Sequence, residues 1–137
     1  TARMGTSCAS KALGVKVTRD VAVRKESVRR SYVMAELRET RDLLEHGRYA
    51  YAAQRLGDAR RQGLHRTDEV QWAGQYAQQV QTGLAARTER WGVVSRPGRT
   101  PVEVDTLAEA RSAAAVYARF GGQVVRLDAT GTWVTAA

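Results

Sequence analysis

The sequence predicts an α+β fold with a basic N-terminal arm, a three-helix region containing a central antiparallel helical hairpin, and a small C-terminal ββαββ module. Two changes of pattern indicate this order. From about Glu26 to position 90, apolar residues recur every three or four positions, as on one face of a helix. From Trp91 the period becomes two, which is typical of strands. We therefore expect an arm over residues 1–25, helices over residues 26–90 and the module over residues 91–137.

The N-terminal arm carries most of the positive charge. The chain has a formal net charge of +8, and residues 1–35 contain eight Lys or Arg against two acids, a net +6. The run GTSCASKALG predicts a short helix that Gly14 ends, and the turn after it also fits a helix-turn-helix. Alternating valines then predict a small hairpin or an extended arm; they are Val15, Val17, Val21 and Val23.

The helical region predicts three helices. Val33, Leu37 and Leu44 form one stripe in the first helix, flanked by Met34 and Thr40, and Gly47 supplies its left-handed end. The second helix runs from about residue 48 to 62 and ends at Gly63 with Leu64 folding back, as in a Schellman motif. The third begins with Thr67 as N-cap and Asp68 and Glu69 in its first turn, where carboxylates favour the helix dipole. Its apolar stripe is Ala73, Ala77, Val80, Leu84 and Trp91.

The second helix carries a motif that resembles a known repeat. Gly47, Tyr49, Ala52, Leu56 and Ala59 have the spacing of the second helix of a tetratricopeptide repeat. No second copy follows at a period near ~34 residues, and such repeats are stable only when several copies stack. The resemblance therefore implies a close helical hairpin with a seam of small residues, and not a repeat protein.

The N-terminus contains a second resemblance. The run from Gly5 through Cys8 to Gly14 looks like the closing half of a zinc knuckle, whose opening cysteines would lie before residue 1. This resemblance implies that Cys8 is a zinc ligand only if the chain is truncated. Cys8 is the single cysteine and has neither His46 nor His65 at ligand spacing, so we predict no metal within the chain. A small buried thiol is the alternative.

The C-terminal module has the most specific signals. Trp91 and Val93, then Val102 and Val104, alternate around Pro97-Gly98, which favours a type II turn. Thr106 and Glu109 predict a capping box. The buried face of the helix that follows is expected to be Leu107, Ala110, Ala114, Tyr117 and Phe120. Two further strands, at residues 123–127 and 132–135, join through the turn at residues 128–131, so the helix should cover one face of an antiparallel sheet.

A basic arm leading into a helix is the charge distribution expected of a protein that lies along a phosphate backbone. The candidate contacts are Lys16, Arg19, Arg24, Lys25, Arg29 and Arg30. A solvated surface, or a basic face that docks an acidic protein, is the alternative. A sheet presenting Trp133 and Tyr117 with Arg96 and Arg99 can also bind single strands; burial of both aromatic residues in the core is the interpretation we favour.

The remaining features argue against catalysis. No Gly-rich phosphate loop lies between a strand and a helix, and no nucleophile has a base at a motif spacing, so we expect no enzymatic activity and no cofactor. The sequence has no run of about 18 apolar residues, so we predict no membrane span. The first residues lack a charged-then-apolar signal pattern, which indicates a cytoplasmic protein.

These observations lead to a functional hypothesis. Arg greatly outnumbers Lys, and Ala, Val and Gly are frequent, as in the GC-rich genomes of actinobacteria and their phages. The chain resembles an actinobacterial or actinophage accessory protein. We expect a non-enzymatic protein that acts on or beside nucleic acid, most simply DNA, and engages a protein partner such as a recombinase through its helical or ββαββ part. The alternative is a structural or assembly component, for example of a phage particle, with no nucleic-acid role.

Overall fold

The computed structural model describes the backbone of residues 2–136 and the side chains of residues 18–136. Three helices come first: α1 (Ala2–Glu45), α2 (Tyr49–Gln62) and α3 (Thr67–Ala85). The C-terminal part contains β1 (Trp91–Val94), β2 (Val102–Val104), α4 (Leu107–Val116), the short 3₁₀ helix η1 (Ala118–Phe120), β3 (Gln123–Leu127) and β4 (Trp133–Thr135). The predicted α+β class, with helices first and a ββαββ module last, is confirmed.

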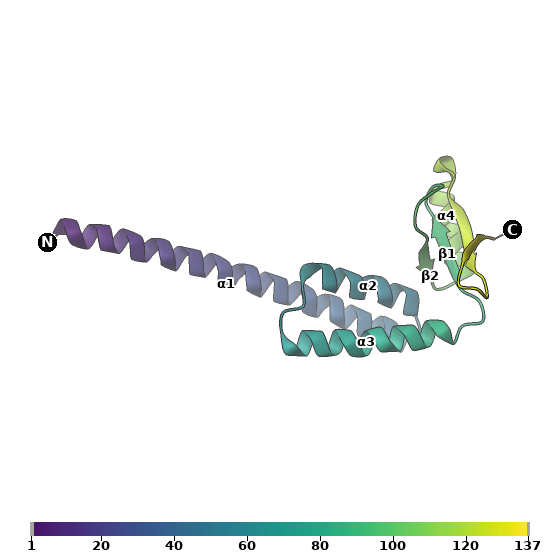
Figure 1. Ribbon diagram of the computed structural model, residues 1–137, viewed down its shortest axis with the longest axis horizontal. Coiled ribbons are helices and arrows are strands. Elements are labelled where there is room, and N and C mark those ends of the chain that lie inside the picture. Colours follow the sequence, from purple (N-terminus) through teal and green to yellow (C-terminus); the bar gives the residue numbers. More distant parts are fainter. Residues whose placement is uncertain (1, 137) are drawn as a thin grey trace.

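The molecule is elongated because α1 is much longer than its neighbours. Figure 1 shows α2 and α3 packed along the C-terminal half of α1, while the N-terminal half extends beyond them. The module with the C-terminus lies at the opposite end of the molecule from the N-terminus. The chain therefore presents two separate ends joined by a helical bundle.

The predicted conformation of the N-terminal arm is wrong. α1 runs without interruption from Ala2 to Glu45, so residues 15–23 form neither a hairpin nor an extended segment, and Gly14 ends no helix. Helix formation is cooperative, and its costly step is the nucleation of the first turn. Because packing in the bundle already fixes the later turns of α1, the helix extends towards the N-terminus without a second nucleation step. One interior glycine costs only about 1 kcal/mol. The spacing from Val21 to Val28 to Tyr32 also fits a helix.

The bundle core consists of the predicted stripes. One cluster joins Val33 and Leu37 of α1 to Leu56 and Ala59 of α2 and Ala73 of α3. A second cluster, nearer the module, consists of Leu44, Ala50, Ala52, Val80 and Leu84. Thr40 is fully buried between them, and its hydroxyl donates to the Glu36 carbonyl at 2.7 Å. Small residues on α2 let the helices approach closely, as the sequence predicts.

The two glycines that end helices do so differently. At Gly47 (φ +69°) the Arg48 N–H donates to the Leu43 carbonyl and the Gly47 N–H to the Leu44 carbonyl, which is a Schellman motif. Gly63 has φ +95° but an extended ψ of 127°, so the Schellman motif predicted there is wrong. Its carbonyl instead accepts a hydrogen bond from Arg29 of α1 at 2.6 Å.

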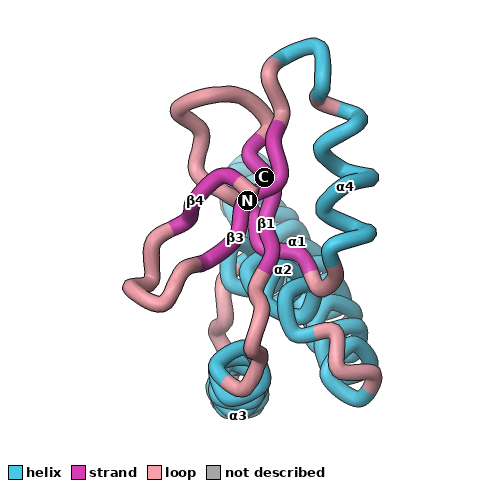
Figure 2. Tube along the Cα trace, turned by 90° about the vertical axis from the view of Figure 1, so that its right-hand side faces the viewer, coloured by secondary structure: helices cyan, strands magenta, loops and turns pink. Residues whose placement is uncertain are grey.

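The module is a four-stranded antiparallel sheet of order β2-β1-β3-β4 within the described residues. Figure 2 shows α4 along one side of the sheet. Val93 and Val104 pack there against Ala110 and Ala114. Gly98 has φ +82° and the Arg99 N–H donates to the Arg96 carbonyl at 3.2 Å, as a type II turn requires. The Thr106 hydroxyl accepts from the Glu109 N–H at 3.1 Å.

Two residues expected on the buried face of α4 are exposed. The α-helix ends at Val116, and the chain continues into η1. Positions 117 and 120 therefore lie beyond the α-helical turns that pack on the sheet through Ala110 and Ala114. Tyr117 is 41% exposed and Phe120 is 56% exposed. Trp133 is partly buried over Gly92, where an added Cβ would lie 3.1 Å from its ring.

Asp105 joins the module to the bundle. Its carboxylate accepts from the backbone N–H groups of Ala50 and Tyr51 at 2.8 and 3.2 Å, so it caps the N-terminus of α2 from another element. Arg87 donates to the same carboxylate at 2.8 Å and to the Gly47 carbonyl at 2.9 Å. The Asp105 carboxylate thus binds both the backbone N–H groups at the start of α2 and the Arg87 guanidinium. These contacts hold the module in a defined position against the bundle.

A close contact between α2 and α3 generates the first prediction. An added Cβ on Gly83 would lie 2.4 Å from the Tyr49 ring, which is packed in the second core cluster. We expect Gly83→Ala to lower the free energy of unfolding by about 1–3 kcal/mol through overpacking. Gly74, in the same helix, has no atom within 4 Å of its position for a Cβ, so Gly74→Ala should stabilise by up to about 1 kcal/mol. Urea unfolding of both variants measures the difference, and equal effects would contradict the packing.

Candidate nucleic-acid interface

The predicted phosphate contacts all lie on α1, but the structure separates them into two groups. Arg19, Arg24 and Lys25 are exposed, whereas Arg29 and Arg30 are partly buried where α1 enters the bundle. The side chain of Lys16, like that of Cys8, lies outside the described side chains. These cations are neighbours in the sequence but differ in their exposure to solvent.

Arg29 and Arg30 converge on one buried carboxylate. Glu69 of α3 is 0% exposed. Its Oε1 accepts from Arg29 at 2.9 Å, and its Oε2 accepts from Arg30 at 2.8 Å and from Arg29 at 3.2 Å. The backbone N–H groups of His65 and Arg66, just before α3, also donate to Oε1, at 3.0 and 3.2 Å. Both oxygens of a fully buried charge are thus satisfied, as burial requires.

Each arginine has a further carboxylate. Arg29 donates to Glu26 through Nε at 2.8 Å and through a terminal nitrogen at 2.6 Å. Arg30 makes a bidentate pair with Asp68, at 2.9 and 2.7 Å. Planar guanidinium groups suit such paired contacts. The five side chains form what we term the Glu69 cluster, which consists of Glu26, Arg29, Arg30, Asp68 and Glu69.

The cluster changes the acidity of its members. Burial by itself raises the pKa of Glu69, but hydrogen bonds from Arg29, Arg30 and two backbone N–H groups lower that pKa well below its usual range. The hydrogen bond from Arg29 lowers the pKa of Glu26 to about 2. A hydrogen bond from Arg30 lowers the pKa of Asp68. All three carboxylates are therefore ionised at neutral pH.

The charges of Arg29 and Arg30 are neutralised within the protein. Two cations and three carboxylates give the Glu69 cluster a formal charge of −1, which Arg66, 3.7 Å from Glu26, brings to zero. Arg29 and Arg30 are thus structural residues that orient α1 on the loop between α2 and α3. From the sequence, Asp68 and Glu69 are expected only to favour the dipole of α3. The structure shows that they also pair with Arg29 and Arg30 of α1.

The part of α1 before Glu26 has the opposite character. Residues 1–25 contain six cations and one acid, a net +5. Every side chain from residue 18 to 25 is exposed. All fourteen Asp and Glu of the chain lie between positions 20 and 128, and none of them forms an ion pair with Arg19, Arg24 or Lys25. We refer to residues 2–25 as the projecting helix.

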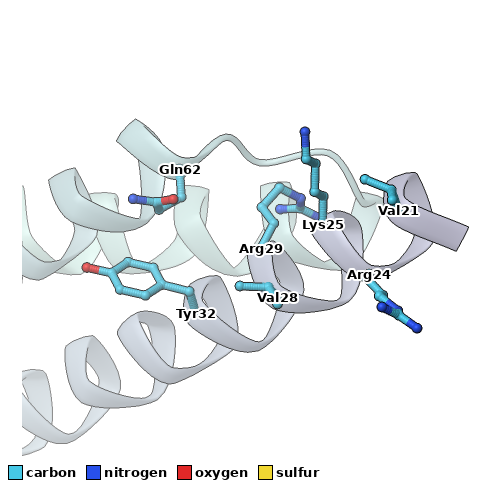
Figure 3. A pocket seen from close by; sticks show the side chains of 7 residues that line it. All are labelled: Val21, Arg24, Lys25, Val28, Arg29, Tyr32 and Gln62. Atoms are coloured by element: carbon cyan, nitrogen blue, oxygen red, sulfur yellow. The ribbon is translucent and has the colours of Figure 1, made fainter. Parts of the chain in front are cut away.

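A shallow apolar groove lies where the projecting helix meets the bundle. It has a volume of about 410 Å³ and is lined by Val21, Arg24, Lys25, Val28, Arg29, Tyr32 and Gln62. Figure 3 shows Val28 and Tyr32 beneath Gln62, with the charged ends of Arg24 and Lys25 extending away from them. Val28 is 70% exposed and Tyr32 is 45% exposed. The groove is therefore an apolar strip with a basic rim.

No family model, curated protein or solved structure matches the chain. None of the helices within residues 2–136 combines the length and the apolar character needed to cross a membrane. Among residues 18–136, no three His, Cys, Asp or Glu side chains lie close enough together to hold a metal ion.

The Glu69 cluster generates a stability prediction. We expect Glu69→Gln to lower the free energy of unfolding by about 3 kcal/mol, the lower end of the range for breaking a buried ion pair, because Arg29 keeps Glu26 and Arg30 keeps Asp68. Glu39, an exposed residue of α1 that forms no ion pair with the described side chains, provides the control. Glu39→Gln should change stability by less than about 0.5 kcal/mol. Chemical denaturation measures both.

The same cluster sets a pH dependence that serves as a second readout. The folded-state pKa values of Glu26 and Glu69 lie below the ordinary 4.5, so the unfolded chain binds more protons at acidic pH. The stabilisation is complete above about pH 4.5 and is lost as the pH falls towards about 2. Stability should therefore fall steeply over this range in the wild type and less steeply in the Glu69→Gln variant. Parallel profiles for the two proteins would contradict the assignment.

Proposed function

We propose that this protein is a non-enzymatic accessory protein that acts on or beside nucleic acid, with the projecting helix supplying the phosphate contacts. The observation that carries the proposal is the set of exposed cations Arg19, Arg24 and Lys25, which have no carboxylate partner, on a helix of net charge +5. Cations that no carboxylate of the chain neutralises are available to replace the counterions of a phosphate backbone. The bundle and the module would then engage a protein partner, such as a DNA-acting enzyme.

The shape of the projecting helix supports the same function. At 1.5 Å per residue, residues 2–25 span about 36 Å, close to one turn of B-DNA. The major groove of B-DNA is about 12 Å wide and admits one α-helix. A single helix standing clear of the bundle, as in Figure 1, can enter a groove or lie along a strand without a clash from α2 or α3. Backbone contacts of this kind position a protein and do not select a sequence.

Neutralising the exposed cations tests the proposal. We expect Arg19→Gln, Arg24→Gln and Lys25→Gln together to weaken binding to a random-sequence DNA duplex. The slope of log affinity against log salt should become shallower by about 0.9 for each phosphate that the variant no longer neutralises. Fluorescence anisotropy over a series of salt concentrations measures both quantities.

A matched variant controls for net charge. Arg38, Arg41 and Arg60 are exposed on the bundle, and changing all three to Gln removes the same charge. Duplex affinity in that variant should stay within about twofold of the wild type, after allowance for weak long-range attraction. An equal loss of affinity in the two triple variants, or no measurable duplex binding by the wild type at low salt, would refute a specific role for the projecting helix.

The groove favours a second candidate function, a protein-interaction or assembly role without nucleic acid. Its basic rim and apolar floor fit an acidic amphipathic helix, whose carboxylates would pair with Arg24 and Lys25 while its apolar face covered Val28 and Tyr32. A second copy of the chain fits less well, because it would bring the same cations against each other. Under this candidate, the positive charge of α1 serves assembly.

The two candidates share Arg24 and Lys25, but each also depends on residues that the other does not use. Arg19 and Val28 are nine positions apart, which at 100° per residue places them on opposite sides of the helix. We expect Val28→Ser with Tyr32→Ser to reduce binding of a synthetic acidic amphipathic peptide and to leave duplex affinity unchanged, with Arg19→Gln giving the reverse pattern. Titration calorimetry with each ligand measures this. If only the peptide binds, the assembly role replaces the nucleic-acid role.

A further inference from the structure

The end of the ββαββ module that is remote from the bundle carries a second basic surface. It combines the type II turn with the end of α4 and η1, and we refer to it as the arginine–aromatic tip. Its members are Ser95, Arg96, Arg99, Tyr117, Arg119 and Phe120. The two segments are in contact, because an added Cβ on Gly121 would lie 3.0 Å from Pro97. In Figure 1 the end of α4 points away from the three helices.

The backbone holds the aromatic residues outward. After η1, Gly121 takes φ +83°, and the Gly122 N–H donates to the Tyr117 carbonyl at 2.9 Å. An added Cβ on Gly122 would lie 2.6 Å from the Tyr117 Cβ, so the chain turns back tightly against that residue. This tight return leaves the rings of Tyr117 and Phe120 accessible, while Arg119 lies over the Phe120 ring at 5.2 Å.

Charge in the module is divided between its two ends. The four acids of residues 91–137 are engaged away from the tip: Glu103 pairs with Arg90, Asp105 caps α2, Glu109 pairs with Arg48, and Asp128 holds its own turn through Thr130 and Thr132. Arg96, Arg99 and Arg119 have no carboxylate partner among the acids of the chain, all of which are described. The tip therefore presents three cations that have no carboxylate partner, one of them over the Phe120 ring, beside two exposed rings.

The hollow at the tip limits what can bind there. Ser95, Arg96, Tyr117 and Phe120 line a depression of about 160 Å³. This depression is smaller than the usual enclosed site for a small molecule, about 300–1,000 Å³. Ser95 and Tyr117 also border a separate hollow of about 320 Å³ beside Tyr51 and Gln54 of α2. A flat group that stacks on an open ring while its charged backbone runs past arginines fits better. Nucleobases on a single strand have this form, whereas paired bases in a duplex are not accessible for stacking.

We propose that the arginine–aromatic tip binds single-stranded nucleic acid, with bases stacked on Tyr117 and Phe120 and phosphates paired with Arg96, Arg99 and Arg119. This inference rests on the proposed function, because it specifies the single-stranded form and a second contact surface for the same class of ligand. The projecting helix and the tip lie at opposite ends of the molecule, so one protein can hold a duplex at one end and a single strand at the other.

The test uses a labelled oligo(dT) and a labelled duplex in parallel. We expect Tyr117→Ala with Phe120→Ala to weaken oligo(dT) binding about tenfold or more, since stacking on an aromatic side chain contributes substantially per base. Duplex binding should be unchanged. Both residues are exposed and alanine keeps the Tyr117 Cβ against Gly122, so the fold should be preserved; circular dichroism confirms this. Val116→Ala, at a neighbouring position that is 71% exposed, is the apolar control.

A charge arm completes the test. Arg96→Gln with Arg99→Gln should make the salt dependence of oligo(dT) binding shallower by about 0.7 for each phosphate that is no longer neutralised, whereas Arg111→Gln, on an exposed position earlier in α4, should not. Comparing oligo(U) with oligo(dT) shows whether RNA or DNA is preferred. Unchanged oligo(dT) affinity in the aromatic variant, or displacement of oligo(dT) by polyglutamate with no dependence on the two rings, would overturn the inference.

The outcomes separate this inference from the proposed function. Duplex binding that depends on Arg19, Arg24 and Lys25 without any oligo(dT) binding supports the proposed function and refutes the role of the tip. Oligo(dT) binding that depends on Tyr117 and Phe120, without a duplex contact from the projecting helix, gives the reverse result.

Discussion

The buried Glu69 carboxylate is the interaction on which the rest of the structure depends. It accepts from two guanidinium groups of α1 and from two backbone N–H groups just before α3, so a single charge joins α1 to α3 and to the loop between α2 and α3. Removing such a charge from water is favourable only when its oxygens are fully paired. The position of α1 relative to α2 and α3 is thereby defined, and so is the point where α1 leaves the bundle.

A division of charge follows from that anchor. Arg29 and Arg30 are neutralised inside the Glu69 cluster, so the unpaired cations described on the projecting helix begin at Lys25 and continue through Arg24 to Arg19. The module repeats the arrangement: Asp105 and Glu109 face the bundle, where Arg87 and Arg48 pair with them, and the unpaired arginines lie at the remote tip. In the bundle and in the module, carboxylates form ion pairs that hold elements of the chain together. Cations without such partners lie at the two ends of the molecule.

Much of the architecture could be predicted because local signals agreed with each other. The stripe of Val33 and Leu37, the left-handed Gly47, the Pro97-Gly98 turn and the Thr106 cap each depend on neighbours within a few residues. The errors arose where distant contacts decide the outcome. The conformation of residues 15–23 follows from an anchor at Glu69, more than forty positions away in the sequence. The exposure of Tyr117 and Phe120 follows from the end of α4 at Val116, which helical periodicity does not reveal. The capping of α3 by Glu69 is local, but its pairing with Arg29 and Arg30 carries no local sequence signal.

The most direct test of this account is an NMR experiment on the arginine side chains, in which ¹⁵N-labelled protein is titrated with duplex DNA. The Arg29 Nε–H, which donates to Glu26 at 2.8 Å, should exchange slowly with water and keep its chemical shift throughout. The Nε–H signals of Arg19 and Arg24 should exchange rapidly in the free protein and should shift as duplex is added. A shift of the Arg29 signal at the same DNA concentrations, or unchanged signals from Arg19 and Arg24, would contradict the assignment of structural and nucleic-acid-binding roles to these arginines.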